Sequence, residues 1–209
     1  MSKQLSTIID TISGAKNELA SYAEQVIDLA VDNELWENVP IVEHATKLLN
    51  IHDIYKKNKL KRNYAAFIEA VGKMDEEEIA SFSKILFSND DVAEETAETI
   101  FEIIVESEKP LKARLIGRLS LALAKQELGL KEYNTIALII QSSSIAALMA
   151  LPLFLASNNN SCHKSGIGSI PEEGLLFSLG IAKRHGNMFR IDETGQLLAI
   201  HGYGIEAST

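Results

Sequence analysis

Lysine and arginine gather at two places in this acidic chain, and their types and spacing predict a binding chemistry. The first place is the sequence KKNKLKR, which supplies Lys56, Lys57, Lys59, Lys61 and Arg62. The second is the C-terminal sequence AKRHGNMFR, which supplies Lys183, Arg184 and Arg190. Ammonium and guanidinium groups in such clusters bind phosphates, carboxylates or an anionic membrane surface. We therefore expect these residues to bind a partner.

Residues that commonly perform catalysis or bind metals do not form a recognised pattern. The histidines are scattered along the chain, at His44, His52, His163, His185 and His201. Cys162 and His163 are adjacent, but they lie in a polar segment that lacks the rigid support a nucleophile or a metal ion needs. The sequence SGIGS lacks the lysine of a phosphate-binding glycine loop. We predict no catalytic residues, no metal site and no cofactor. We therefore expect a protein that is not an enzyme.

The overall charge limits the kind of partner. The chain of 209 residues has a formal net charge of −9. The average field of such a protein repels nucleic acid, although a local contact with either basic cluster stays open. The single cysteine excludes an intramolecular disulfide, and the first twenty residues lack the unbroken apolar core of a signal peptide. We expect a cytoplasmic protein.

The elements that must position the basic residues are mainly helical. Nearly half of the residues are hydrophobic, 6% are aromatic and only four are proline, which favours helices. Apolar residues at steps of three and four predict an amphipathic helix over residues 8–29 and a second helical stripe over 41–52. The basic run then interrupts this pattern before Tyr64 and Val71 resume it. Because helical steps of about 100° would spread its charges around the circumference, we expect a solvated hinge there.

Three further helix starts are predicted from capping residues. Asp75 can cap the helix of MDEEEIASFSKILFS, with Glu78 three residues later as in a capping box. The acidic first turn of SNDDVAEETAETIFEIIV suits the positive end of a helix dipole. Its buried face should comprise Val92, Thr96, Ile100, Ile103 and Ile104. Pro110 suits the first turn of a helix that ends near Gly129. The acidic clusters therefore indicate helix N-termini before any general acid or metal site.

The apolar stretch IALIIQSSSIAALMALPLFLAS, residues 136–157, is long enough to span a membrane. Gln141 and three serines interrupt it, Pro152 lies in its last third, and no basic cluster flanks it. A helix that is apolar all round is equally expected at the centre of a helical bundle. We favour this second interpretation, in which neighbouring helices bury Ile139, Ile140, Leu148 and Met149. A membrane-associated segment at 136–156 is the alternative.

The C-terminal segment differs from the rest in pattern. A short helix at 171–179 should lead into two strands, GIAKR and MFRI, with a turn at HGN. After them, DETG either closes a hairpin or lets Asp192 cap a short helix. We expect a mainly α fold with a helical bundle at 1–157, a linker at 158–169 and a small α+β tail at 170–209. The tail would be a β-hairpin or a winged-helix-like unit.

Three segments carry a resemblance to a known group of proteins. They begin at ENVPIVEHATKLLN, at EKPLKARLIGRLSLALAKQELGL and at LLFSLGIAKRHGNMFRI, and together they cover most of the chain after Glu37. This pattern resembles a loosely defined family of uncharacterised prokaryotic and mobile-element proteins, some of which occur near phage-defence genes. The resemblance implies a soluble helical module, a winged-helix-like tail and a setting in bacterial or phage conflict.

These observations favour a non-catalytic accessory protein that binds a macromolecular partner through the tail or the basic run. A protein partner fits best, and a homo-oligomer stays open. The first alternative is a DNA-binding transcriptional regulator that uses the tail as a wing. The helix before the strands, PEEGLLFSLG, argues against this because a recognition helix should carry basic or amide side chains. The second alternative is a membrane-associated effector that inserts residues 136–156.

Overall fold

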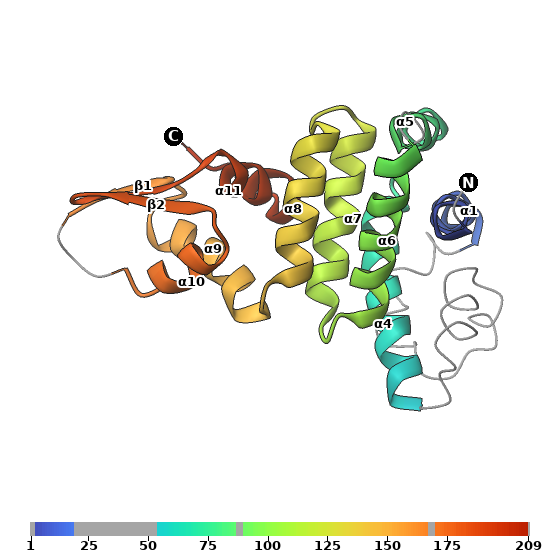
Figure 1. Cartoon of the computed structure of the whole chain (residues 1–209), viewed down its shortest axis with the longest axis horizontal. Coiled ribbons are helices and arrows are strands. Elements are labelled where there is room, and N and C mark those ends of the chain that lie inside the picture. The colour runs from blue at the N-terminus through green and yellow to red at the C-terminus, as the bar shows by residue number, and fades with distance from the viewer. Residues whose placement is uncertain (1–2, 19–53, 87–89, 167–169, 209) are drawn as a thin grey trace.

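The computed structural model describes residues 3–18, 54–86, 90–166 and 170–208, and it is an elongated molecule with two ends of different character (Figure 1). Helices fill one end and a small sheet occupies the other. The helices before the sheet are α1 (Lys3–Glu18), α4 (Ile54–Val71), α5 (Glu76–Leu86), α6 (Asp90–Glu106), α7 (Pro110–Ala124), α8 (Leu130–Ser142) and α9 (Ile145–Ser157). The structure confirms the predicted mainly α fold with a small C-terminal α+β part.

Helices α4 and α7 make the most extensive contact of any described helix pair, and Gly117 permits their close approach. A Cβ atom at Gly117 would lie only 2.8 Å from the carbonyl oxygen of Phe67 and 3.0 Å from the Cβ of Ala70. The side chains of Tyr64 and Phe67 are fully buried beside this contact. The stripe predicted for the N-terminal helix is confirmed where it can be checked, since Ile8 and Ile12 are buried. The stripe over 41–52, with His44 and His52, lies outside the described residues.

Local sequence signals place several helix ends correctly. The main-chain N–H of Asp75 donates to Glu78 Oε2 at 2.9 Å, and the N–H of Glu78 donates to Asp75 Oδ1 at 2.8 Å, which completes the predicted capping box. Pro110 begins α7 as expected. On α6 the predicted inner face is buried, except that Val92 at its start is only half-buried.

The basic run is helical, so the predicted hinge is wrong. Residues 54–71 form one continuous helix, α4. Leu60 is 1% exposed and Asn63 is fully buried, so the inward stripe that leads to Tyr64 continues through the run. Lysine and arginine also lose little rotamer freedom in a helix, which makes them good helix formers. The basic run therefore continues the helix at a place where the pattern of apolar residues suggested a break.

The apolar stretch is two helices, which corrects the predicted single helix. Helix α8 ends at Ser142 and α9 starts at Ile145. The helix axis bends by 118° between them. Ser144 caps α9 by accepting a hydrogen bond from the N–H of Ala147. Ile140 and Leu148 are buried as predicted and Ile139 is partly buried, but Met149 is 39% exposed, so that prediction was wrong. No described helix is by itself long and apolar enough to cross a membrane, and the bent pair meets the criterion only in combination.

Pro152 lies inside α9. A proline nitrogen cannot donate to the carbonyl four residues earlier, which here belongs to Leu148. The hydroxyl of Tyr203 donates to this carbonyl instead, at 2.7 Å. A side chain from the C-terminal part thus replaces the missing backbone donor, and the helix continues to Ser157.

The C-terminal part contains three strands and short helices. Strands β2 (Ala182–His185) and β3 (Met188–Ile191) form the predicted hairpin after α10 (Glu173–Ser178). A third strand, β1 (His163–Ser165), lies within the predicted linker, and the antiparallel sheet has the order β1-β3-β2. Asp192 caps α11 (Glu193–Leu197), so of the two open interpretations of DETG the helix is confirmed. The chain then continues as the π-helix η2 (Leu198–Tyr203).

Helix α9 joins the bundle to this sheet. It packs against α10, and the rings of Phe154 and Phe189 meet edge to face with centroids 5.1 Å apart. Cys162, just before β1, is fully buried, and burial raises the pKa of its thiol. The hydrophobic core is therefore continuous from α1 to the strands.

Candidate binding surface

The side of the sheet that faces away from α9 and α10 is formed by polar and basic side chains. Because side chains alternate along a strand, residues in register across neighbouring strands share one side. Arg190 is paired with His163 on one side and with Lys183 on the other. Met188 is likewise paired with Ser165 and with His185. We call this surface of six residues, His163, Ser165, Lys183, His185, Met188 and Arg190, the sheet face.

The sheet face is open to solvent at its centre. Lys183 and Arg190 are exposed, and Met188, at the centre of the neighbouring row, is 48% exposed. Within the part of the chain that the structure describes, the side chains of Lys183 and Arg190 make no hydrogen bond or ion pair. Their ammonium and guanidinium groups therefore remain available for a ligand on that side.

Arg184 was predicted to bind a partner, but it lies on the opposite side of the sheet and serves the fold. Its Nη2 donates to Glu173 Oε2 at 2.6 Å, and Nε donates to Oε1 of the same carboxylate. The guanidinium carbon also lies 5.8 Å from the ring centroid of Phe189. The hydrogen bond from Arg184 lowers the pKa of Glu173, and the carboxylate in turn raises the pKa of Arg184. This pair ties α10 to β2.

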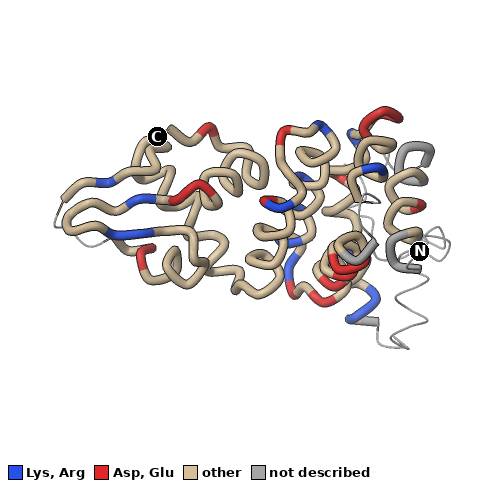
Figure 2. Tube along the Cα trace, turned by 45° about the horizontal axis from the view of Figure 1, so that its top comes forward, with Lys and Arg blue, Asp and Glu red and all other residues tan. Residues whose placement is uncertain are grey.

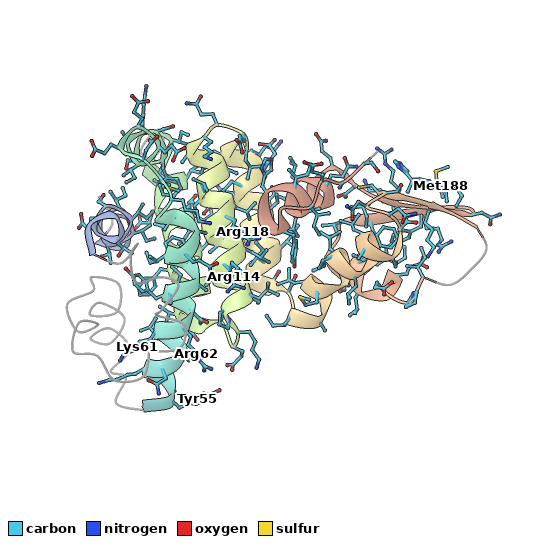
Figure 3. All side chains as sticks on the ribbon, turned by 180° about the vertical axis from the view of Figure 1, so that it is seen from behind. Tyr55, Lys61, Arg62, Arg114, Arg118 and Met188 are labelled. Atoms are coloured by element: carbon cyan, nitrogen blue, oxygen red, sulfur yellow. The ribbon has the colours of Figure 1, made fainter. Side chains whose placement is uncertain are left out.

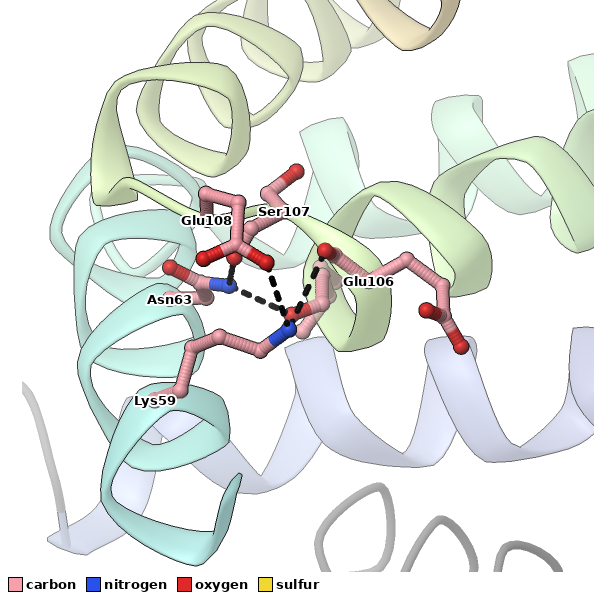
Figure 4. Close-up of polar contacts among 6 residues, drawn as sticks. Lys59, Asn63, Glu106, Ser107 and Glu108 are labelled. Carbon is pink, nitrogen blue, oxygen red and sulfur yellow. Dashed lines mark hydrogen bonds and ion pairs between the residues drawn. The ribbon is translucent and has the colours of Figure 1, made fainter. Parts of the chain in front are cut away.

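Lys59 is likewise occupied within the fold. Its Nζ donates to the main-chain carbonyl of Glu106 at 3.2 Å and lies 3.6 Å from Glu108 Oε1 (Figure 4). The side chain is only 14% exposed. A cation at the C-terminal end of α6 satisfies an open carbonyl and interacts favourably with the helix dipole. Asn63, one turn further along α4, donates to the carbonyls of Ile104 and Ser107 at 3.0 and 2.6 Å.

The other cations of the run do not share one surface. Lys56, Lys57 and Arg62 are exposed, whereas Lys61 is half-buried. Figure 3 shows Lys61 and Arg62 near the same end of α4 as Tyr55, far along the molecule from Met188. Figure 2 shows the same separation of the basic residues of α4 from those of the strands. The structure therefore does not bring the two predicted clusters together.

Sequence reasoning missed a second group of polar residues, in a cleft bounded by α4, α7 and η2. Arg114 and Arg118 from α7 are the principal ones (Figure 3). The two arginines are four residues apart and only partly buried, whereas most other positions of α7 are buried. Two arginines one turn apart on a mainly apolar helix were the available signal for this cleft.

Among the described residues no group of three or more His, Cys, Asp or Glu side chains is arranged to hold a metal ion. No family model matches the chain, and neither a curated protein nor a solved structure is significantly similar to it.

Proposed function

We propose that this protein is a non-catalytic binding protein whose sheet face docks on an acidic region of a protein partner. The observation that carries this proposal is the row of Lys183, Arg190 and His163 across the three strands, with exposed Met188 in the next row. Arginine and methionine are enriched in protein interfaces, and unpaired cations on a flat surface complement carboxylates. The arrangement combines an apolar contact with charge selectivity.

The charge of the tail favours a protein partner over DNA. Residues 158–209, the linker and the tail together, contain four Lys or Arg and five Asp or Glu, so this part of the chain as a whole does not attract a phosphate backbone. Helix α10 has only six residues, and its Glu173 is held by Arg184. Exposed Leu175 and Phe177 on this helix suit a protein contact better than a DNA groove.

The size of the sheet face predicts a weak or transient complex. Three strands about 4.8 Å apart and three or four residues long give a surface well below the ~800 Å² that each partner buries in a standard interface. Binding should therefore depend strongly on Arg190 and Lys183 and weaken as salt increases. The setting in phage defence or counter-defence is supported by the family resemblance described above.

The test compares two charge-reversal variants of the full chain in affinity capture from native cells. K183E/R190E should lose the captured protein, because it places two carboxylates opposite an acidic surface. The matched control K56E/K57E reverses two exposed cations of α4 and should retain it. Equal retention by both variants would contradict the proposal. Loss of the captured material after nuclease treatment would instead support the DNA-binding alternative.

A further inference from the structure

The cleft between α4, α7 and η2 is a second place where charged side chains converge. It has a volume of about 410 Å³. Glu69 comes from α4 and Lys73 from the turn after it. Arg114 and Arg118 come from α7, and His201 comes from η2. Ligand sites in proteins commonly measure about 300–1,000 Å³ and occur where separate structural units meet. This cleft lies where the bundle meets the C-terminal part (Figure 3).

The cleft has an excess of positive charge, whereas the chain as a whole is negative. Three cations, Lys73, Arg114 and Arg118, face one carboxylate, that of Glu69. Arg114 Nε lies 3.2 Å from Glu69 Oε2, which offsets one positive charge. His201 is directed toward another acidic side chain, with its Nδ1 3.8 Å from Glu127 Oε2. The excess is two positive charges in a protein with a net charge of −9.

Both arginines retain unused donors. Arg118 Nη1 donates to the carbonyls of Gly202 and Tyr203 at 3.2 and 3.3 Å, which fixes the guanidinium against the end of η2. A guanidinium group has five N–H donors in a planar fork. Within the described part of the chain, Arg118 Nη2 and both Nη atoms of Arg114 make no hydrogen bond. Two pre-positioned forks one helical turn apart suit a tetrahedral oxyanion.

We propose that this cleft binds a small molecule that carries a phosphomonoester group. A phosphomonoester has a charge of about −1.5 to −2 at neutral pH, which matches the excess of two cations. Arg114 and Arg118 bind its oxygens, and exposed Lys73 contributes charge at the rim. The cleft is larger than one phosphate group, and Ala70, Leu121 and the Tyr203 ring provide an apolar wall for the organic part of the ligand.

The experiment is calorimetric titration of the full chain with phenyl phosphate and with inorganic phosphate, at constant ionic strength. Phenyl phosphate should bind more tightly, because its ring contacts the apolar wall. E69Q should bind it roughly threefold more tightly, since Arg114 loses its competing carboxylate. K73Q should bind it more weakly by a similar factor. K84Q, an exposed position on α5 outside the cleft, should match the wild type.

Three results would overturn the proposal. The first is the absence of binding by either probe, and the second is unchanged affinity in both E69Q and K73Q. The third is a phosphotyrosine peptide that binds more than tenfold tighter than phenyl phosphate, because that would identify a modified protein as the ligand. The melting temperature of each variant without ligand separates a binding effect from a folding effect, since Glu69 also pairs with Arg114.

Discussion

The basic residues of α4 and those of the sheet both form clusters in the sequence, but they have different surroundings in the structure. In α4 the partly buried Lys59 donates to a main-chain carbonyl at the end of α6. In the sheet, Lys183 and Arg190 are directly opposite each other on neighbouring strands and are exposed. The densest cluster in the sequence is thus dispersed in space, whereas Lys183 and Arg190, seven positions apart in the sequence, become neighbours.

The difference follows from the geometry of the two elements. A helix turns successive side chains by about 100°, so adjacent lysines point in different directions. An antiparallel pair places residues from two strands side by side with Cβ atoms about 5 Å apart. The cations of α4 therefore point in different directions, and those of the sheet form the aligned surface that we propose as the binding site.

The largest expected effect on stability is at Asn63, which directly follows the basic run in α4. N63L removes two hydrogen bonds and leaves the carbonyls of Ile104 and Ser107 without this donor. The buried Oδ1 of Asn63 has no partner, and its removal offsets part of the loss. We expect a decrease of about 2 kcal/mol in the free energy of unfolding, measured with urea. The half-buried Asn58 gives the control N58L, and an equal decrease in both variants would contradict this role of Asn63.

A smaller effect is expected where Tyr203 replaces the backbone donor missing at Pro152. Y203F leaves the carbonyl of Leu148 unpaired and should decrease the free energy of unfolding by about 1–2 kcal/mol. In a P152A background the alanine N–H can donate to that carbonyl, so Y203F should cost less there. A double-mutant cycle measures the coupling directly. Additive effects would show that Tyr203 and Pro152 are independent.

The comparison between structural and exposed cations is tested within α4 itself. K59M removes the donor to Glu106 and the partner of Glu108, and we expect a loss of about 0.5–1 kcal/mol in the free energy of unfolding. K57M changes an exposed lysine two residues earlier and should have almost no effect. Thermal unfolding of the two variants under the same conditions measures the difference. A larger loss in K57M would reverse our assignment of the two lysines.

The smallest effect concerns the pH dependence of the Arg184–Glu173 pair. Because Arg184 lowers the folded-state pKa of Glu173, the ionised carboxylate stabilises the fold above its unfolded pKa. This contribution should disappear as the pH falls through the lowered folded-state pKa. The melting temperatures of the wild type and E173Q should therefore differ slightly at neutral pH and converge in acid. Parallel curves at all pH values would contradict the assignment.

The parts of the fold that follow from the sequence are those set by neighbouring residues. The capping box of Asp75 and Glu78, the proline at the start of α7 and the β2–β3 hairpin all depend on contacts a few residues apart. The division of residues 136–157 into two helices also has a local cause, the Ser144 cap, but the continuous apolar composition concealed it.

The parts that could not be predicted depend on distant residues. Pro152 is accommodated because Tyr203, far along the chain, supplies a donor. Strand β1 exists because β3 pairs with a short polar segment that looked like a linker. The candidate surfaces also depend on residues that are distant in the sequence. The cations of the sheet face were identified from the sequence, but their alignment with His163 requires the register of β1, and the role of Lys59 requires the position of α6.

The central claim, that a protein partner docks on the sheet face, is tested most directly with the methionine methyl groups. Met188 lies in the sheet face, Met149 is an exposed methionine on α9, and Met74 is buried in the bundle. NMR spectra of protein labelled at the methionine methyl carbons are recorded with increasing amounts of the captured partner. We predict that the Met188 signal shifts while those of Met149 and Met74 remain in place. An unchanged Met188 signal together with a shifted Met149 signal would place the partner on α9 and contradict the claim.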